Sequence, residues 1–278
     1  MKKIAFGLIA LLSTFGTSAF AADMASPGWV GTGEPVRFTW TGFYVGGIAG
    51  AAISRPQTNL TVTDGIVVPG GVLYYPPGNV AALQNLGSVK SSDPTGAFGG
   101  RIGYNYQAGA YVWGIEGDIT SIRSKISRLT TGNPFAGCAV CSATFNSTTK
   151  TDWVSTVRGR WGMPVDRVML YATGGVAFGK VSFTNSYFGV PPNVALGLTD
   201  SESSSASKTM VGWTIGGGFD YTINTHWVIS LDYEHIDLGN LKAAGTVIVS
   251  NPTVSNSSMN FSTHIYEDIV SAGLGYKF

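Results

Sequence analysis

The sequence predicts an all-β protein, an eight-stranded antiparallel up-and-down transmembrane β-barrel. Three observations predict this fold: an alternating final strand, eight segments of similar pattern, and connections that are alternately short and long. In the final stretch, 262–278, apolar residues alternate with small or polar ones; the apolar set is Val270, Ala272, Leu274, Tyr276 and Phe278. A strand with an apolar outer face, a polar inner face and an aromatic end is typical of outer-membrane barrels.

The N-terminal residues 1–21 have the pattern of a secretory signal peptide. Lys2 and Lys3 form a short positive region, and residues 4–12 form an apolar core that is too short to span a bilayer. Small residues at the cleavage positions follow in Ala19-Phe20-Ala21. We therefore expect export through the secretory route, with cleavage near Ala21.

The mature chain then divides into two parts. Residues 22–39 contain Pro and Gly and are expected to form a periplasmic lead-in, and residues 40–278 are expected to form the barrel domain. Loss of the signal removes two lysines and no acidic residue, so the formal net charge changes from +1 to −1. Such a charge gives no polyanion-binding surface, which excludes nucleic acid as a partner.

Composition limits the fold class further. Charged residues make up only 12% of the chain, whereas Gly (38), Phe (14), Tyr (12) and Trp (7) are plentiful. After the signal, no stretch approaches the roughly 20 apolar residues that a transmembrane helix needs. An exported chain of this kind is either a secreted β-sandwich or an outer-membrane barrel, and strand length and loop asymmetry favour the barrel.

Eight segments alternate over the length that a tilted membrane strand needs, about 9–11 residues. A register slip of one residue would place Arg158 or Asp232 in lipid, so the alternation fixes the facing of most strands. The glycine-rich first segment is the exception, and its facing stays open. The predicted strands are 40–52, 96–107, 110–120, 152–163, 167–183, 208–222, 226–238 and 262–278.

The connections alternate strictly between two lengths. Residues 107–109, 164–166 and 224–225 are tight turns. The others are long and rich in Ser, Thr, Asn, Gly and Pro: 53–95, 121–151, 184–207 and 239–262. Outer-membrane barrels have short periplasmic turns and long extracellular loops. Because the number of strands is even and the short turns are periplasmic, both termini of the barrel are expected at the periplasmic end.

Several stretches resemble a known family. They are WTGFYVGG (40–47), STVRGRWG (155–162), LYATGGVAFG (170–179), KTMVGWTIGGGFDYTINTHW (208–227) and LGYKF (274–278). In this order they resemble the small outer-membrane barrels called outer membrane immunogenic proteins, a porin-like family of Gram-negative bacteria. The resemblance implies an OmpA-type barrel at the cell surface. It does not imply one activity, because members are known as structural, antigenic, adhesive or haem-binding proteins.

Eight charged residues are predicted to face the lumen: Arg101, Glu116, Asp118, Arg158, Arg160, Asp220, Asp232 and Glu234. Opposite charges can meet across a narrow barrel and form a polar plug. The alternative is an ion-selective constriction, which needs a wider lumen. An eight-stranded barrel has an interior just wide enough for its own side chains, so the strand number favours the plug.

Cys138 and Cys141 lie in the second long connection, which is predicted to face an oxidising environment. A redox C-x-x-C motif normally accompanies a βαβ pattern, which is missing here. Two cysteines without a nearby histidine do not make a closed zinc site. We therefore interpret the pair as a candidate disulfide that staples a loop.

Two histidines near the predicted outer rim raise the alternative of an enzyme. His235 and His264 lie close in sequence to Asp237, Ser262 and Asp268, and Glu267 is also near. A nucleophile needs a base within hydrogen-bond reach and a third orienting group. Because Ser, Thr and Asp occur throughout the connections, this pattern has little specificity. We expect no enzymatic activity, no cofactor and no metal site.

Two further features point to interactions. The ending Leu274, Tyr276 and Phe278 resembles the signal that the barrel-assembly machinery reads during biogenesis. The connection 53–95 carries the apolar runs 66–68 and 72–75, which either pack against other loops or contact a partner.

These observations predict a monomer in the outer membrane, surrounded by outer-membrane lipid, with a structural and surface-exposed role of antigen or adhesin type. One alternative is a narrow porin that passes small solutes or ions. Another is capture of haem or a host ligand by the loops.

Overall fold

The computed structural model describes residues 38–63, 67–68, 72–73, 77–135, 137–190, 199–249 and 257–278. The predicted signal peptide, 1–21, and all but the last two residues of the predicted lead-in, 22–39, lie outside the described residues. All the strands belong to one compact unit, Phe38–Phe278.

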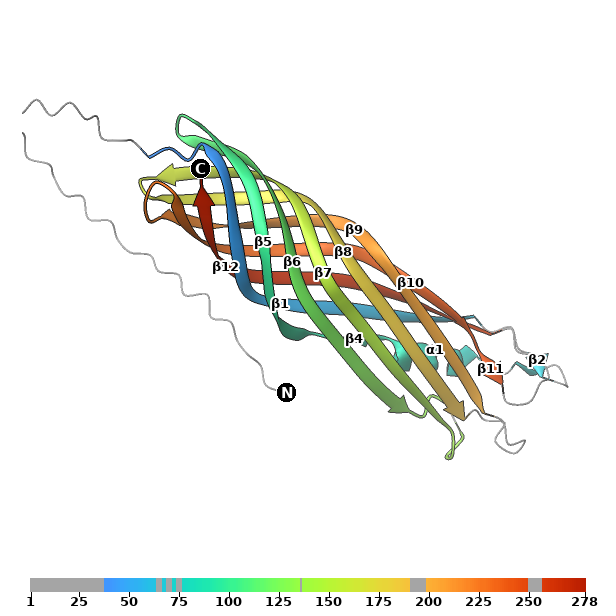
Figure 1. Cartoon of the computed structure of the whole chain (residues 1–278). Coiled ribbons are helices and arrows are strands. Elements are labelled where there is room, and N and C mark those ends of the chain that lie inside the picture. Colours follow the sequence, from blue (N-terminus) through green and yellow to red (C-terminus); the bar gives the residue numbers. More distant parts are fainter. Residues whose placement is uncertain are drawn as a thin grey trace, which may run out of the picture. The chain divides into compact units, whose positions relative to one another are not determined.

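Eight long antiparallel strands close into a ring (Figure 1). Consecutive long strands pair with one another, β9 pairs with β10, and β12 pairs with β1 to complete the ring. This confirms the predicted eight-stranded up-and-down barrel. The strands are β1 (Gly42–Thr63), β5 (Asp93–Ala108), β6 (Tyr111–Gly132), β7 (Ser142–Val165), β8 (Val168–Val190), β9 (Asp200–Thr222), β10 (Trp227–Thr246) and β12 (Ser258–Lys277).

Three short turns gather at one end of the barrel, where the C-terminus also lies (Figure 1). Gly109 connects β5 to β6 with a φ of 61°, and Asp166 connects β7 to β8 with a φ of 54°. Gly and Asp tolerate this left-handed conformation better than other residues. Residues 223–226 connect β9 to β10. The predicted tight turns are therefore present where the sequence placed them.

The strands extend well beyond their predicted ends. The predicted connection 121–151 is largely strand, because β6 continues to Gly132 and β7 begins at Ser142. Long strands here have 16 to 24 residues, whereas about 9–11 are enough to cross a membrane. In these extensions, outward Ser and Thr residues alternate with buried side chains, many of them apolar, such as Ile122, Ile126 and Phe145. The barrel therefore continues beyond the membrane.

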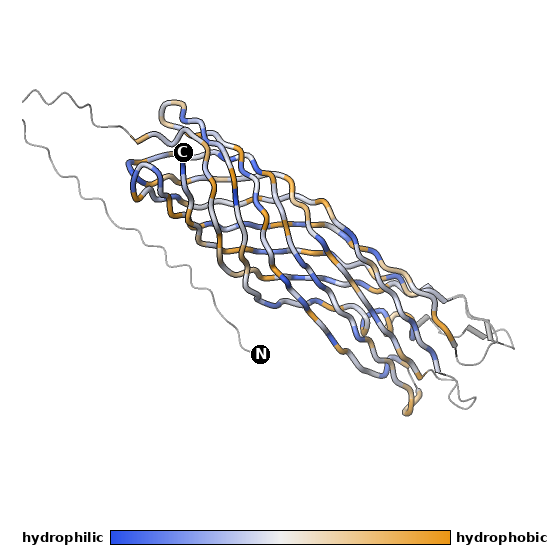
Figure 2. Tube along the Cα trace, in the orientation of Figure 1, coloured by the Kyte–Doolittle hydropathy of each residue, from blue (hydrophilic) through white to orange (hydrophobic). Residues whose placement is uncertain are grey.

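Outward side chains divide this barrel into two halves. The membrane half extends from the short turns to an outer limit marked by Phe98, Ile119, Val211, Tyr233 and Val270. Its outward side chains are large, apolar and exposed. We call the remaining part, towards helix α1 (Pro77–Gly87), the extracellular half, after the orientation that the short turns predict. Hydrophobic and hydrophilic residues alternate along the strands (Figure 2), as the two faces of a barrel wall require.

The extracellular half has the opposite arrangement, with apolar residues inside. Its lumen is filled by a buried core that includes Leu60, Ile122, Phe145, Phe183 and Phe261. Its outer face carries hydroxyl pairs that hydrogen-bond across strands, Ser127 with Thr148, Thr131 with Thr144, and Ser182 with Ser207. Water surrounds this half, so most of its polar groups lie outside and most of its apolar groups lie inside.

Shorter elements lie at the extracellular end (Figure 1). Helix α1 adds the fully buried Leu83 to the luminal core. Strand β2 (Val67–Val68) pairs with β3 (Val72–Leu73), β4 (Val89–Lys90) pairs with β1, and β11 (Ile248–Val249) pairs with β9. The rest of the apolar runs 66–68 and 72–75 lies outside the described residues. In the described part of the chain, no helix is long and apolar enough to cross a membrane.

β-Bulges mark the boundary between the two halves. The register shifts between Ser121 and Ser124 on β6 and between Thr151 and Val154 on β7. Arg123, within the first shift, has a φ of 49°. Bulges bend a strand and redirect its side chains, and these lie where the surroundings of the wall change from lipid to water.

A polar cluster is buried on β7, β8 and β9 in the extracellular half. Tyr187 Oη lies 3.2 Å from both carboxyl oxygens of Asp200. Asn185 Nδ2 donates to Glu202 Oε2 at 2.9 Å, and Ser147 Oγ donates to Asn185 Oδ1 at 2.7 Å. Burial raises the pKa of Asp200 to about 7 and also raises the pKa of Glu202.

The raised pKa of Asp200 predicts a pH-dependent stability. The folded state holds the Asp200 proton more tightly than the unfolded state does. The protonated carboxyl therefore contributes to the unfolding free energy, and this contribution is fully present below pH ~4 and is lost as the pH rises through about 7. We expect Asp200→Asn to gain unfolding free energy relative to wild type between pH 5 and pH 8, by at most about 3 kcal/mol. Urea unfolding of the refolded barrel at both pH values measures this difference. An equal difference at both pH values would contradict the assignment.

Candidate functional site

All eight charged residues predicted to face the lumen lie together in the membrane half. Strand alternation directs each side chain inward, and each residue is buried, with 1–7% of its surface exposed. They come from five of the eight strands: Arg101 on β5, Glu116 and Asp118 on β6, Arg158 and Arg160 on β7, Asp220 on β9, and Asp232 and Glu234 on β10.

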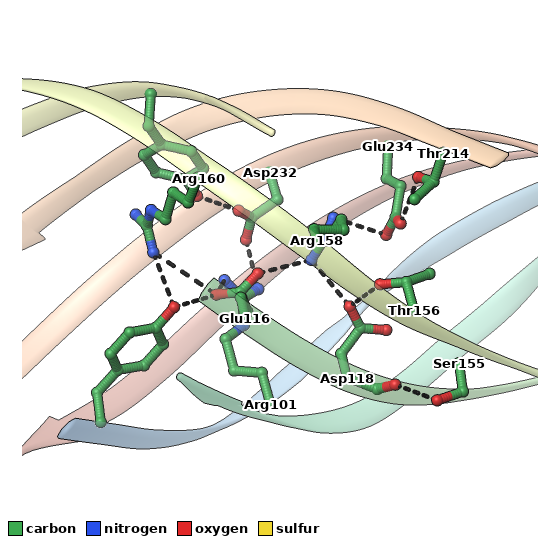
Figure 3. A network of polar contacts seen from close by, with 12 residues as sticks. Arg101, Glu116, Asp118, Ser155, Thr156, Arg158, Arg160, Thr214, Asp232 and Glu234 are labelled. Carbon is green, nitrogen blue, oxygen red and sulfur yellow. Dashed lines mark hydrogen bonds and ion pairs between the residues drawn. The ribbon is translucent and has the colours of Figure 1, made fainter. Parts of the chain in front are cut away.

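Arg158 lies at the centre of one group of contacts (Figure 3). Its Nη2 atom lies 2.6 Å from Glu116 Oε1 and 2.9 Å from Asp118 Oδ2. Its Nη1 atom lies 3.0 Å from Glu234 Oε2, on the other side of the lumen. One guanidinium therefore connects three carboxylates from two strands, only one of which is a neighbour of β7.

Arg101 and Arg160 hold the remaining carboxylates. Arg101 Nη2 lies 2.5 Å from Asp232 Oδ2, and its Nη1 lies 3.7 Å from Glu116 Oε2. Arg160 pairs with Asp220 and lies 3.5 Å from Glu116 Oε2. Glu116 therefore contacts all three arginines, and each charge has a partner, as buried charges require.

Two tyrosines complete the network. Tyr44 Oη donates to Glu116 Oε2 at 2.7 Å, and Tyr171 Oη donates to Asp232. The Arg160 guanidinium lies 3.6 Å from the ring centroid of Tyr171, which is cation–π geometry. Sequence reasoning missed Tyr44 because glycines hide the alternation of its strand. Tyr171 was not among the residues predicted for the lumen network.

Threonine hydroxyls satisfy two of the carboxylates on the extracellular side of the network (Figure 3). Thr156 Oγ1 donates to Asp118 Oδ2 at 2.5 Å, and Thr214 Oγ1 donates to Glu234 Oε1 at 2.7 Å. The sequence offered no signal for these roles, because Thr is frequent on every strand.

Little space remains beside the network. On its periplasmic side, a cavity of about 30 Å³ is lined by residues that include Trp40, Tyr44, Arg160 and Lys277. A volume of this size holds about one water molecule. On its extracellular side lies the apolar core. Because so little space remains around them, the charged side chains of the network are held in fixed positions.

The two cysteines form a disulfide in the connection between β6 and β7. Cys138 and Cys141 are joined with their Cα atoms 5.5 Å apart. Cys141 is buried and Cys138 packs against the same apolar core. The bond closes a ring of only a few residues, so its effect on stability is local.

The outer-rim histidines are paired with carboxylates on the outer face of β10 and β12. His235 Nδ1 lies 2.7 Å from Asp268 Oδ1, and His264 Nε2 lies 2.8 Å from Asp237 Oδ1. Asp268 also pairs with Arg55 at 2.5 Å. No hydrogen bond among the described residues joins a serine hydroxyl to either ring. No group of three or more His, Cys, Asp or Glu in this part of the chain is arranged to hold a metal ion.

The C-terminal residues end in the periplasmic aromatic belt. Leu274 and Phe278 are exposed on the outer face, and Tyr276 packs against His226, Trp227 and Phe278. The Phe278 amide donates to the Phe43 carbonyl at 2.9 Å, which fastens the end of the chain to β1.

Loss of one charge from the network is expected to destabilise the barrel. Arg158→Ala leaves Glu116, Asp118 and Glu234 without their shared partner. Removing one member of a buried pair typically costs about 3–5 kcal/mol. Reversible urea unfolding in lipid vesicles measures this loss.

The matched control is Arg128→Ala, because Arg128 is an exposed arginine outside the network that hydrogen-bonds Ser91. We expect this control to change the unfolding free energy by less than about 1 kcal/mol. Equal effects of the two substitutions would show that the network does not hold the barrel together.

Comparisons with known proteins agree with this architecture. The family model for the outer membrane protein beta-barrel domain matches residues 7–278. The chain is 33% identical, over the whole of both sequences, to the 31 kDa outer-membrane immunogenic protein of Brucella melitensis. It is also 27% identical to the 22 kDa outer membrane protein of Rhizobium leguminosarum bv. viciae, over 71% of this chain and 74% of that protein.

Among solved structures, the chain is similar to the outer membrane protein OprG from Pseudomonas aeruginosa. The identity is 12%, the TM-score is 0.43, and the match covers 86% of this chain and 97% of that one. The family model and the Brucella relative both cover nearly the whole chain, and the relatives are outer-membrane proteins. This chain therefore belongs to the outer membrane protein beta-barrel domain family, among the outer-membrane immunogenic proteins, and resides in the outer membrane.

Proposed function

We propose that this protein is a closed, monomeric outer-membrane barrel that stiffens the membrane and presents a rigid surface outside the cell. One observation carries this proposal: three arginines and five carboxylates are mutually paired across a lumen that they fill. Ions that crossed would have to break these pairs. Beyond them, the lumen holds an apolar core together with the buried polar cluster around Asp200 and Glu202.

The porin alternative has weaker support. An eight-stranded barrel has no width to spare, and the cavity beside the network is about 30 Å³. A porin needs a continuous aqueous path, whereas this lumen contains the ion pairs followed by an apolar core. The charges therefore act as a structural plug in our proposal.

The extracellular half supports a role at the surface. Residues 124–132 continue β6 beyond its bulge for roughly 30 Å along the strand. This wall is a regular sheet with a polar outer face, so it presents fixed epitopes rather than flexible loops. Relatives are named immunogenic proteins, and recognition of the exposed wall would account for such a property here.

A catalytic role and capture of haem have less support from the geometry. Both rim histidines are hydrogen-bonded to aspartates on the outer wall, so each ring would have to exchange a partner before it bound iron. The Ser262 hydroxyl makes no hydrogen bond to His264 among the described residues. We therefore propose no catalytic residue and no cofactor.

Assembly completes the proposal. The barrel-assembly machinery is expected to read the exposed Leu274, the aromatic Tyr276 and the terminal Phe278. A chain that lacks Phe278 also loses the hydrogen bond to Phe43 that closes the ring at its periplasmic end. Such a chain is therefore the natural negative control for a test in cells.

The test compares strains without the protein with strains that regain it. A deletion strain is expected to take up more N-phenylnaphthylamine and to tolerate less detergent, because a membrane-filling barrel is missing. The intact gene restores both properties, whereas a gene that lacks the codon for Phe278 does not, since its product fails to insert. Dye fluorescence on whole cells measures the effect.

Solute uptake separates the proposal from the porin alternative. We expect the deletion to leave uptake of small sugars and amino acids unchanged. Reduced uptake with normal detergent tolerance would contradict the structural role and indicate a pore.

A further inference from the structure

Four cationic side chains gather on the outer wall directly above the membrane half. They are Arg123 and Lys125 on β6, Lys150 on β7 and Lys180 on β8, all exposed. We call them the basic patch. The acidic side chain among them is Asp152, which lies 3.9 Å from Lys180, with both side chains about half exposed. The patch therefore carries a net positive charge.

The arrangement of the patch is unfavourable in the absence of an anion. Lys125 lies directly opposite Lys150 in the β6–β7 register, and like charges directly opposite each other destabilise a sheet. No ion pair among the described residues involves either lysine. A bound anion would offset the repulsion between the two lysines. Arg123 has its guanidinium 5.9 Å from the ring centroid of Phe98, which places it at the boundary with the membrane half.

An apolar hollow lies on the membrane-facing wall below the patch. It is a shallow, open depression of about 440 Å³, and its outward lining includes Val45, Gly100, Ile102, Gly117 and Val157. A Cβ atom added at Gly100 or Gly117 would meet only ordinary contacts, at 3.6 Å. Strand packing therefore does not require glycine at these two positions. The missing side chains leave a depression that faces hydrocarbon.

The distance between the two features is close to the thickness of one leaflet. Gly117 in the hollow and Arg123 in the patch lie six positions apart on β6, one of which is the extra residue of the bulge, so they are about 17 Å apart along the strand. At a tilt of about 45° this corresponds to roughly 12 Å across the membrane, somewhat less than half of the ~30 Å hydrocarbon core. The hollow therefore lies within the outer leaflet and the patch at its outer surface.

We propose that the basic patch and the hollow together bind one phosphorylated lipid of the outer leaflet. The phosphate lies between Lys125 and Lys150 with Arg123 beside it, and an acyl chain follows β6 down into the hollow. Charge complementarity identifies the headgroup, and the lipid-facing position of the hollow identifies the chain. A free phosphate ion would use the cations alone, and a protein partner would need no hollow within the hydrocarbon region. This site is independent of any role of the lumen.

Binding can be measured on the full-length barrel purified from outer membranes into detergent micelles. Bisphosphorylated lipid A is the probe, and native mass spectrometry counts the bound lipid. Each neutralised lysine near a charged lipid surface weakens binding about 5-fold, so Lys125→Gln with Lys150→Gln is expected to lower affinity about 30-fold. Lys90→Gln with Lys242→Gln is the matched control and is expected to bind like wild type, since both lysines are exposed elsewhere on the wall.

A second pair of variants tests whether the hollow binds the acyl chain. Gly117→Val fills it, whereas Gly159→Val places the same side chain at a glycine that also has room for a Cβ but lies outside the lining. We expect only Gly117→Val to lower lipid A binding. Heat modifiability on gels checks that both variants fold.

Three outcomes would overturn the proposal. One is equal binding by the Lys125/Lys150 variant and the Lys90/Lys242 control. Another is equal binding of lipid A stripped of its phosphates. The third is displacement of lipid A by equimolar inorganic phosphate, which would indicate an ion site without a lipid.

Discussion

The buried ion pairs across the lumen are the interaction on which the rest of the structure depends. Backbone hydrogen bonds connect each strand only to its two neighbours in the ring. The side-chain pairs connect strands that are not neighbours, as Arg101 on β5 and Arg158 on β7 do with Asp232 and Glu234 on β10. Because an unpartnered charge in this interior is costly, the pairs hold the walls at a fixed separation and also close the lumen.

The two halves of the barrel show one wall adapted to two solvents. In lipid, the outer face is apolar and charges can be placed inside, where they satisfy one another. In water, the same strands carry hydroxyls and lysines outside, as at Thr148 and Lys150, and pack Phe145 and Phe183 inside. The bulges at Ser121/Ser124 and Thr151/Val154 lie where this inversion occurs. The extracellular half therefore has an apolar core of its own, built on the continuation of the membrane strands.

The membrane half could be predicted from sequence because strict alternation and scarce charges leave one acceptable register. That reasoning placed Arg158, Glu116 and Asp232 in the lumen, where the structure has them. The extracellular strands could not be predicted in the same way, because Ser and Thr are equally common in loops and on wet strand faces. Helix α1 was missed because its apolar residues, such as Leu83, are buried by tertiary contacts with the strands. Tyr44 was missed because small residues on both faces of β1 conceal the alternation.

Single-channel recording of the purified, refolded wild-type protein in planar bilayers tests the central claim most directly. A lumen closed by mutually paired charges and an apolar core is expected to give no steady conductance at moderate voltage, at both low and high salt. Steady, ion-selective openings, with a selectivity that changes in Arg158→Ala, would show that the charges line a pore and would contradict the account.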